Sequence, residues 1–381
     1  MRVLFSSTSG YGHNFPMVPL ARAFVAHGHE VRWATGEAAC VLVSDAGLDA
    51  EPAGLSGESL AELRGRMGRA TVDVPPEGKA AFMFPRFFGA GMAPPMLADL
   101  LPLARDWRPA LLVHDHAELA APLVAALIGA RSVTHSYGSA IPESFIAAAG
   151  ELLAPMWAEH GLTVPPYAGC FEAPYLDICP PRVQSVPMTH IPVAAPLRPV
   201  PYTGPPATAL PACVDGEPLV YLTLGTVMNQ ASVLRAAADG LAGLGVRLLV
   251  TVGPDADPAA LGDQPTHVTV ERYVSQTEVL PHCTAVVSHG GSGTFLGALH
   301  HGLPQVLLPQ AADQFRNAQA AQSSGVGLAL RPDEATPEAI AEAVRRILAE
   351  ESFRTAAAGL AADIAAMPAP DEVVDVLERL A

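Results

Sequence analysis

The sequence predicts an α/β protein in which two Rossmann-like, doubly wound domains face each other across a cleft. Its 381 residues, of which 50% are hydrophobic, are enough to form two cores of ordinary size. In both halves short apolar runs alternate with helical segments, as in parallel sheets that carry helices on both faces. Between the halves, residues 194–218 are dense in proline, which indicates a linker.

The alternation of strands and helices begins at the N-terminus. Arg2–Ser6 is a short apolar run typical of a buried strand, and Phe15–Gly28 follows with the apolar stripe of a helix. The same pattern continues to His135. We expect strands at 2–6, 30–35, 110–113 and 132–135, with helices at 15–28 and 119–127.

Residues 55–95 are less regular, because glycines and prolines interrupt a segment that is rich in phenylalanine and methionine. Two interpretations remain open. Either the apolar side chains line a pocket, or the segment is a loop packed on the core of its own domain. Further on, Met156 and Trp157 add large apolar side chains in a helical region, residues 144–160.

After the proline-rich stretch the alternation restarts. We expect strands at 219–224, 247–252, 267–270, 285–288 and 305–308, with helices at 234–244 and 337–349. The last residues, Glu372–Leu380, form an amphipathic pattern.

Composition excludes several classes of partner. The formal net charge of −16 argues against a nucleic acid or an anionic membrane, since either would need clustered basic residues. No apolar run is as long as a transmembrane helix, and no basic leader precedes the first strand. The five cysteines are scattered without metal-ligand spacing, which favours reduced thiols in a cytoplasmic protein. The sequence leaves open whether the chain forms a homodimer.

Residues 285–320 contain a buried strand, a glycine-rich turn, a helix and a second buried strand. The turn runs from His289 to Thr294 and opens the helix. Its three glycines let the backbone approach a ligand closely, and free N–H groups at a helix start attract anions. Hydroxyls and an imidazole add donors, so the turn has the chemistry of a diphosphate cradle. The alternative is a glycine turn that only packs a helix on a sheet.

Together with the ending Pro309–Gln314, this run resembles the nucleotide-sugar signature of family-one glycosyltransferases of the GT-B fold, in their bacterial natural-product (antibiotic) form. The resemblance covers residues 286–320. It implies an acceptor-binding N-terminal domain and a nucleotide-sugar-binding C-terminal domain, joined by the linker, and a last helix that crosses back to the N-terminal domain. We place these parts at 1–200, 201–217 (linker), 218–365 and 366–381.

The resemblance also implies a set of positions that contact the nucleotide sugar. Tyr273 lies where plant relatives stack a tryptophan on the base, and Val274 offers backbone contacts. Asp313 and Gln314 are suited to accept hydrogen bonds from vicinal hydroxyls of the sugar. The implied set is Gly225, Thr226, Tyr273, Val274, His289, Gly291, Ser292, Gly293, Thr294, Asp313 and Gln314.

Two polar residues follow strands of the first half, where open α/β sheets bind ligands. His13 lies in a glycine-rich loop and can act as a base, although a lone loop histidine is often incidental. In the resembling family, a histidine in this Gly-x-Gly-His-x-x-Pro context is the acceptor-activating base, and Asp115 matches the carboxylate that orients it. Alternatively, Asp115 caps the following helix, or His114-Asp115-His116 binds a metal, although strand neighbours point to opposite faces.

One position departs from relatives that use UDP-glucose. They carry a glutamate for the ribose hydroxyls where this chain has Gly297. A glycine fits a nucleotide without a 2′-hydroxyl, so we expect a dTDP-sugar as co-substrate rather than a UDP-sugar. We expect no metal and no further cofactor, because the helix dipole and His289 hold the phosphate and Asp255-Ala256-Asp257 fits a turn.

These residues predict an inverting transfer of a (deoxy)sugar from the donor to a hydrophobic natural-product aglycone, with His13 as general base. A nucleotide-sugar epimerase and a non-catalytic nucleotide-sugar-binding protein are alternatives, and the intact His13 loop and phosphate turn argue against them. A serine hydrolase fits less well, because Thr294 stands where the nucleophile elbow needs glycine. The sequence leaves open whether the product is an O- or a C-glycoside.

Overall fold

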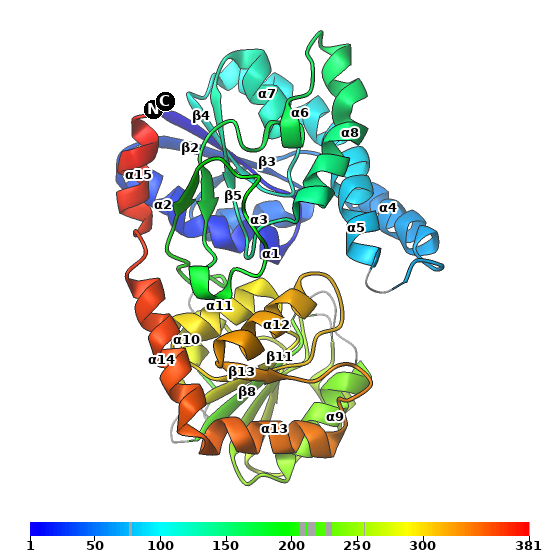
Figure 1. The fold of residues 1–381 in the computed structure, drawn as a ribbon, viewed down its shortest axis with the longest axis vertical. Helices are drawn as coiled ribbons and strands as arrows, with labels where there is room; N and C mark the ends of the chain where they lie inside the picture. Colours follow the sequence, from blue (N-terminus) through cyan, green and yellow to red (C-terminus); the bar gives the residue numbers. More distant parts are fainter. Residues whose placement is uncertain (76–77, 206–209, 212–217, 226–230, 255, 381) are drawn as a thin grey trace. The chain divides into compact units, whose positions relative to one another are not determined.

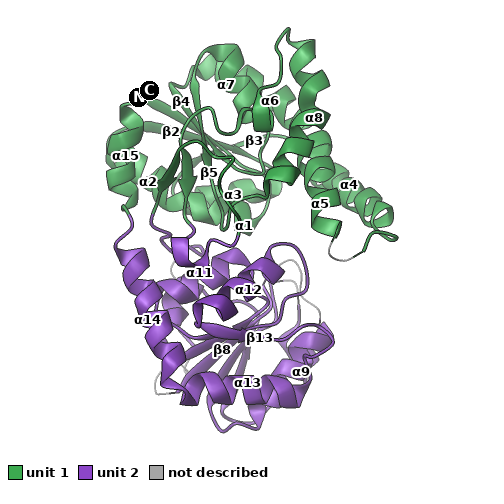
Figure 2. Ribbon diagram, in the orientation of Figure 1, with its two compact units in different colours: residues 1–178, 186–197, 368–381 green, residues 179–185, 198–367 purple. Residues whose placement is uncertain are grey.

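The computed structural model describes residues 1–75, 78–205, 210–211, 218–225, 231–254 and 256–380. The chain divides into two compact units, which Figure 2 colours separately. Unit 1 contains Met1–Ile178, Val186–Leu197 and Pro368–Ala381, and unit 2 contains Cys179–Ser185 and Arg198–Met367. Residues 179–185 and 198–200, expected in the N-terminal domain, group with unit 2, as do residues 366–367, expected in the returning helix. Much of the expected linker lies outside the described residues.

Unit 1 is built on a seven-stranded parallel sheet in the order β3-β2-β1-β4-β5-β6-β7. Its strands are β1 (Arg2–Ser6), β2 (Glu30–Thr35), β3 (Asp49–Pro52), β4 (Leu111–Asp115), β5 (Arg131–His135), β6 (Tyr175–Asp177) and β7 (Ala194–Pro196). The sequence pattern predicted the four central strands and missed the three outer ones. Those strands have only three or four residues, too few to show a period.

Successive side chains of the central strand point to opposite faces of this sheet. Leu4 packs into a core formed with α6 and α7, whereas Phe5 stacks on Trp33, with ring centroids 5.2 Å apart, and meets Phe24 of α2 on the other face. The helices of unit 1 are α1 (Tyr11–Asn14), α2 (Val18–Ala26), α3 (Glu37–Asp45), α4 (Gly57–Ala70), α5 (Lys79–Phe84), α6 (Ala93–Trp107), α7 (Ala121–Ile128), α8 (Glu143–Glu159) and α15 (Pro370–Glu378).

The segment that looked irregular in the sequence is largely helical. After α4, a continuous helical stretch runs from α5 through a π-helical piece, Pro85–Met92, into α6. Pro85, Pro94 and Pro95 fall at the first positions of Pro85–Met92 and of α6, which tolerate the missing N–H group, whereas Pro102 lies inside α6. Lys79–Trp107 is also long and apolar enough to cross a membrane by length and composition. In the fold, however, Met96, Leu100 and Trp107 belong to the core of unit 1.

Unit 2 has a six-stranded parallel sheet in the order β10-β9-β8-β11-β12-β13. Its strands are β8 (Leu219–Thr223), β9 (Arg247–Thr251), β10 (Val268–Glu271), β11 (Ala285–Ser288), β12 (Gln305–Leu307) and β13 (Gly327–Ala329). Its helices are α9 (Ala231–Ala242), α10 (Gln276–Val279), α11 (Ser292–His300), α12 (Gln314–Ser324), α13 (Pro337–Ala349) and α14 (Glu351–Ala365). Side chains of α9 and α13 cover one face, and those of α10 and α11 contribute to the core on the other.

Each sheet contains a point at which the strand order reverses. In unit 1 the chain moves from β1 outward to β2 and β3, then returns to add β4 on the other side of β1. In unit 2, β8 and β11 are neighbours for the same reason. The loops that follow such a pair diverge and leave space for a ligand at the carboxyl ends of the strands.

The last helix, α15, belongs to unit 1 and packs against α2 (Figures 1 and 2). Val373, Val374 and Leu377 are buried on one side of α15. His29, just after α2, contacts Glu378 at 2.7 Å and the N-terminal amine of Met1 at 3.0 Å. His29 therefore connects the N-terminus of the chain to its last helix. The four cysteines among the described residues are free thiols.

Replacing Leu377 by alanine should lower the free energy of unfolding by about 2–5 kcal/mol, because a fully buried leucine leaves a cavity. Urea denaturation measures this change. Val376→Ala is the matched control, since Val376 is 43% exposed on the same helix and should change stability by no more than about 0.5 kcal/mol. Equal small effects of both substitutions would contradict the packing of α15.

Candidate functional site

Unit 1 brings together the two polar residues that follow its central strands. His13 lies on α1, just after β1, and Asp115 is the last residue of β4. The imidazole Nδ1 and the carboxylate Oδ2 are 2.8 Å apart. The side chain of His13 is 21% exposed, whereas that of Asp115 is 1% exposed. Because the carboxylate is acceptor-only when ionised, Nδ1 carries the hydrogen, and the exposed ring keeps Nε2 to accept a proton.

The carboxylate of Asp115 is held by further hydrogen bonds. Thr8 donates to Oδ2 through its hydroxyl at 3.0 Å and its backbone N–H at 3.3 Å, and the N–H of Ala117 donates to Oδ1. Burial by itself would raise the pKa of Asp115, but the charge and hydrogen bond of His13, with smaller contributions from His116 and Ala117, lower that pKa below its ordinary value. The carboxylate is therefore ionised at neutral pH and stabilises an imidazolium.

Capping of the following helix, the alternative role of Asp115, falls to another residue. Glu118 accepts the N–H groups of Ala120 at 2.7 Å and Ala121 at 3.2 Å, at the start of α7, and the hydroxyl of Ser6 at 2.8 Å. Burial raises the pKa of Glu118 to about 7. Sequence reasoning missed this residue, although an acidic side chain just before an apolar helix is a known capping signal.

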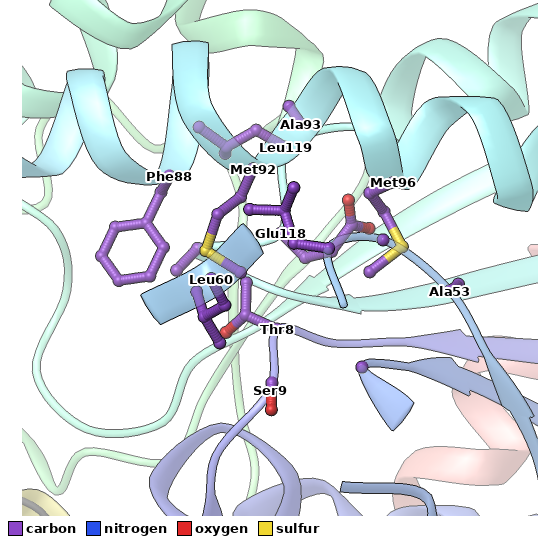
Figure 3. Close-up of a pocket in the computed structure, with 14 residues that line it drawn as sticks. Thr8, Ser9, Ala53, Leu60, Phe88, Met92, Ala93, Met96, Glu118 and Leu119 are labelled. Atoms are coloured by element: carbon purple, nitrogen blue, oxygen red, sulfur yellow. The ribbon is translucent and has the colours of Figure 1, made fainter. Parts of the chain in front are cut away.

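An apolar pocket lies beside this pair (Figure 3). The pocket is partly open to solvent, and Thr8 and Glu118 are polar residues on its wall. The ring of Phe88, on the pocket wall, has its centroid 5.7 Å from that of His13. The full lining is Thr8, Ser9, Gly36, Ala53, Gly54, Leu55, Leu60, Phe88, Met92, Ala93, Met96, Ala117, Glu118 and Leu119.

The pocket answers the question that the sequence left open for residues 55–95. The segment does both, because Phe84 is buried in the core of unit 1 whereas Phe88 and Met92 line the pocket. Tyr137, which no sequence motif indicated, also contacts His13. Its ring lies edge-on to that of His13, with centroids 4.7 Å apart.

The two histidines beside Asp115 are parts of the core. His114 contacts the carbonyl oxygen of Glu118 at 2.9 Å and the hydroxyl of Thr134 at 3.0 Å, and His116 contacts the hydroxyl of Tyr175 at 3.1 Å. Burial lowers the pKa of both imidazoles, that of His116 to about 3. Within the described part of the chain, no group of three or more His, Cys, Asp or Glu side chains is arranged to hold a metal.

In unit 2, the glycine-rich turn lies between β11 and α11, at the point where the strand order reverses. The imidazole of His289 sits between two glycines. An added Cβ would come within 2.6 Å of the ring at Gly225 and within 2.5 Å of it at Gly291. Burial lowers the pKa of His289 to about 4, so the ring is neutral at pH 7, and its buried Nδ1 has no partner among the described residues.

The first turn of α11 supplies further donors. No side chain caps this helix at Gly291, and the Cα of Gly293 faces open space. The hydroxyl of Thr294 accepts a hydrogen bond from Gln276 at 3.1 Å, which leaves its own hydrogen to donate. Uncapped N–H groups at the start of a nine-residue helix form a favourable place for an anion.

The hydroxyl of Ser292 is hydrogen-bonded to the side chain of Asp313. It donates to Oδ2 of Asp313 at 2.6 Å, so its hydrogen is not directed at a phosphate. The side-chain amide of Asn317 donates to the same oxygen at 3.2 Å and to the carbonyl oxygen of Gly290 at 2.8 Å. Asn317 had no role in the sequence analysis, because only the fold brings it from α12 to the turn.

Gln314 is also partly engaged. Its carbonyl oxygen accepts the backbone N–H groups of Gln310 at 2.7 Å and Ala311 at 2.9 Å, which uses both lone pairs. These bonds hold a tight loop in which Ala312 has φ of 54°. The Asp313–Gln314 pair therefore offers a ligand one carboxylate oxygen and one amide NH₂ group, rather than two free acceptors.

The other positions implied by the resemblance lie around the expected nucleotide. The hydroxyl of Tyr273 donates to the carbonyl oxygen of Thr203, and Tyr273 is 43% exposed. The side chain of Val274 is buried in the core, so only its backbone is available to a ligand. Thr226 lies outside the described residues. At Gly297 an added Cβ would come within 3.2 Å of the Leu280 side chain, which would have to shift by a few tenths of an ångström to admit it.

Comparison with known proteins identifies the family. Models of the erythromycin biosynthesis protein CIII-like N-terminal and C-terminal domains match residues 22–214 and 238–380. The chain belongs to this CIII-like family of glycosyltransferases. One relative, the L-demethylnoviosyl transferase of Streptomyces niveus, is 34% identical, over 99% of this chain and 97% of its own length.

Two solved glycosyltransferases of the GT-B fold are also similar to this CIII-like chain. VinC, solved with dTDP, has a TM-score of 0.84 and 27% identity, over 100% of this chain and 99% of its own. The spinosyn rhamnosyltransferase SpnG, complexed with spinosyn aglycone, has a TM-score of 0.81 and 30% identity, over 99% of this chain and 100% of its own. The expected fold class, two α/β domains of the GT-B type, is confirmed, and the protein is an enzyme.

Gly291→Ala should lower the free energy of unfolding by about 1–3 kcal/mol, because the new methyl group must displace the buried ring of His289. Urea denaturation of the ligand-free enzyme measures this. Gly293→Ala serves as the control, since its methyl group meets no atom within 4 Å and should leave stability unchanged or raise it by up to about 1 kcal/mol. Two variants of equal stability would show that the ring is not confined by Gly291.

Proposed function

We propose that this glycosyltransferase moves a (deoxy)sugar from a dTDP-sugar to a hydrophobic natural-product aglycone in antibiotic biosynthesis, with inversion at the anomeric carbon. The observation that carries the proposal is the His13–Asp115 pair, which borders an apolar pocket at the reversal point of the unit 1 sheet. A hydrogen-bonded base beside an apolar surface suits the activation of a hydroxyl on a hydrophobic acceptor.

In the proposed reaction, Nε2 of His13 takes the proton of the acceptor hydroxyl as its oxygen attacks the anomeric carbon. The new carbon–oxygen bond forms while the bond from that carbon to the diphosphate breaks, and dTDP leaves with the electron pair. Asp115 stabilises the imidazolium that results. A general base of this kind contributes about 10²- to 10⁴-fold to the rate.

The leaving diphosphate is assigned to the turn that opens α11. The helix start donates N–H groups, and Thr294 retains a hydroxyl hydrogen. His289 is neutral at pH 7, so it contributes a hydrogen bond rather than a positive charge. Donors that are already oriented stabilise the charge that develops on the leaving oxygen without reorganisation. This step needs no metal ion.

The choice of dTDP rests on two observations. VinC, a similar enzyme of the same fold, was solved in complex with dTDP. In this chain, Gly297 packs closely on Leu280, and no glutamate is present at that position to bind a ribose 2′-hydroxyl. The alternatives, an epimerase or a non-catalytic binder, have less support, because the relative and the solved enzymes named above are transferases. A cytoplasmic location remains part of the proposal.

His13→Ala should reduce kcat for glycosyl transfer by about 10²- to 10⁴-fold, because no other group takes the hydroxyl proton. The dissociation constant for dTDP, measured by calorimetry, should be unchanged, since His13 and the phosphate turn belong to different units. Asp115→Asn should give a smaller loss of kcat with the same dTDP affinity. Parallel loss of turnover and of dTDP binding in His13→Ala would refute the assigned role.

Wild-type enzyme should bind dTDP about tenfold more tightly than UDP, a difference of 1.4 kcal/mol, because the 2′-hydroxyl of UDP lacks its usual partner. Calorimetry of both nucleotides measures this difference. Incubation of the enzyme with dTDP-deoxysugars and a panel of aromatic and polyketide aglycones, followed by mass spectrometry, then tests the transfer itself. Tighter binding of UDP, or release of an epimerised donor without acceptor, would overturn the proposal.

A further inference from the structure

Asn317 links the phosphate turn of unit 2 to the carboxylate of Asp313. It lies on the first turns of α12 and is only 3% exposed. Its side-chain NH₂ group contacts the carbonyl oxygen of Gly290 at 2.8 Å, the hydroxyl oxygen of Ser292 at 3.1 Å and Oδ2 of Asp313 at 3.2 Å. The buried amide of Asn317 therefore joins Gly290, in the turn, to Asp313, which directly precedes α12.

The number of hydrogens and lone pairs determines what remains for a ligand. An amide NH₂ group has two hydrogens, so one serves Gly290 and the other is shared between Ser292 and Asp313. Ser292 gives its single hydroxyl hydrogen to Oδ2 of Asp313. Oδ2 thus receives two donors, whereas Oδ1 receives none from the described residues. Only Oδ1 is left to accept from a ligand.

We propose that Asn317 is a positioning residue that, with Ser292, fixes the Asp313 carboxylate against the phosphate turn, so that Oδ1 accepts one hydroxyl of the donor sugar. The inference rests on the proposed function, because it assumes a nucleotide-sugar donor. Because Oδ2 already accepts two hydrogen bonds, a hydroxyl of the ligand has to reach the carboxylate at Oδ1.

This geometry separates two parts of donor binding. The diphosphate is assigned to the backbone N–H groups at the start of α11 and to His289. The sugar depends on Oδ1, whose direction is set by Asn317 and Ser292. Because Asn317 also donates to the carbonyl oxygen of Gly290 in the turn, the measure of its positioning role is the ratio of the two affinities: loss of the amide should weaken binding of the sugar part more than binding of the nucleotide part.

The test compares dTDP with dTDP-L-rhamnose, which differ by the sugar, in calorimetric titrations of four variants. Asn317→Ala and Ser292→Ala each remove one donor to Oδ2. Each should lower the affinity for dTDP-L-rhamnose about tenfold relative to the affinity for dTDP. Asp313→Asn removes the carboxylate and should abolish the preference for the sugar nucleotide. Gln319→Ala is the matched control, because it truncates an exposed amide on the same helix and should change neither affinity.

A double variant tests whether Asn317 acts through Asp313. In the Asp313→Asn background, Asn317→Ala should produce no further change in the ratio of the two affinities, since the carboxylate it orients is gone. A merely structural role would instead lower the affinities for dTDP and dTDP-L-rhamnose by the same factor in every background, and that result would overturn the inference. If Asn317→Ala does not fold, Ser292→Ala decides the question by the same ratio.

The control titrations separate this inference from the proposed function. Wild-type enzyme that binds no dTDP would refute the donor assignment, and the role of Asn317 with it. Wild-type enzyme that binds dTDP and gains affinity from the rhamnosyl group, while Asn317→Ala and Ser292→Ala keep the wild-type ratio, would refute the positioning role alone.

Discussion

The arrangement of both units depends on a parallel sheet whose first strand is not at its edge. The chain adds β2 and β3 on one side of β1 and then β4 on the other, so the loops after β1 and β4 diverge. The loops after β8 and β11 diverge in the same way. His13 and Asp115 meet only because their strands are adjacent and end together. The phosphate turn meets Gly225 for the same reason. Chemistry that is far apart in the sequence is brought together by strand order.

Much of the fold follows from the sequence because it rests on local patterns. The central strands are short, mostly apolar runs, and their alternation with helical segments identifies them. The outer strands β3, β6 and β7 are too short for that, and β3 has no buried residue. The helices of segment 55–95 were missed because proline and glycine were taken as interruptions, although Pro85, Pro94 and Pro95 occupy helix starts.

The site shows the same division between local and long-range information. The glycine turn, His13 and Asp115 belong to local motifs, so the sequence supplies them. Hydrogen-bond partners are different, because they depend on tertiary contacts that no motif records. Sequence chemistry assigned the hydroxyl of Ser292 to a phosphate, whereas the fold places it 2.6 Å from Asp313. Asn317 acquires its role only when distant parts of the chain are packed together, and so does the bond of Ser6 to Glu118, whereas the capping of α7 by Glu118 is local.

The passage of the chain between the units has a consequence for engineering hybrid enzymes. Unit 1 contains three separate segments, the last of which begins at Pro368. A chimera that joins the first half of one enzyme to the second half of another at a single point would give unit 1 a foreign α15. That helix would have to match α2 without having evolved with it. Exchanging a whole unit between relatives therefore calls for two junctions, one near residue 198 and one near residue 367.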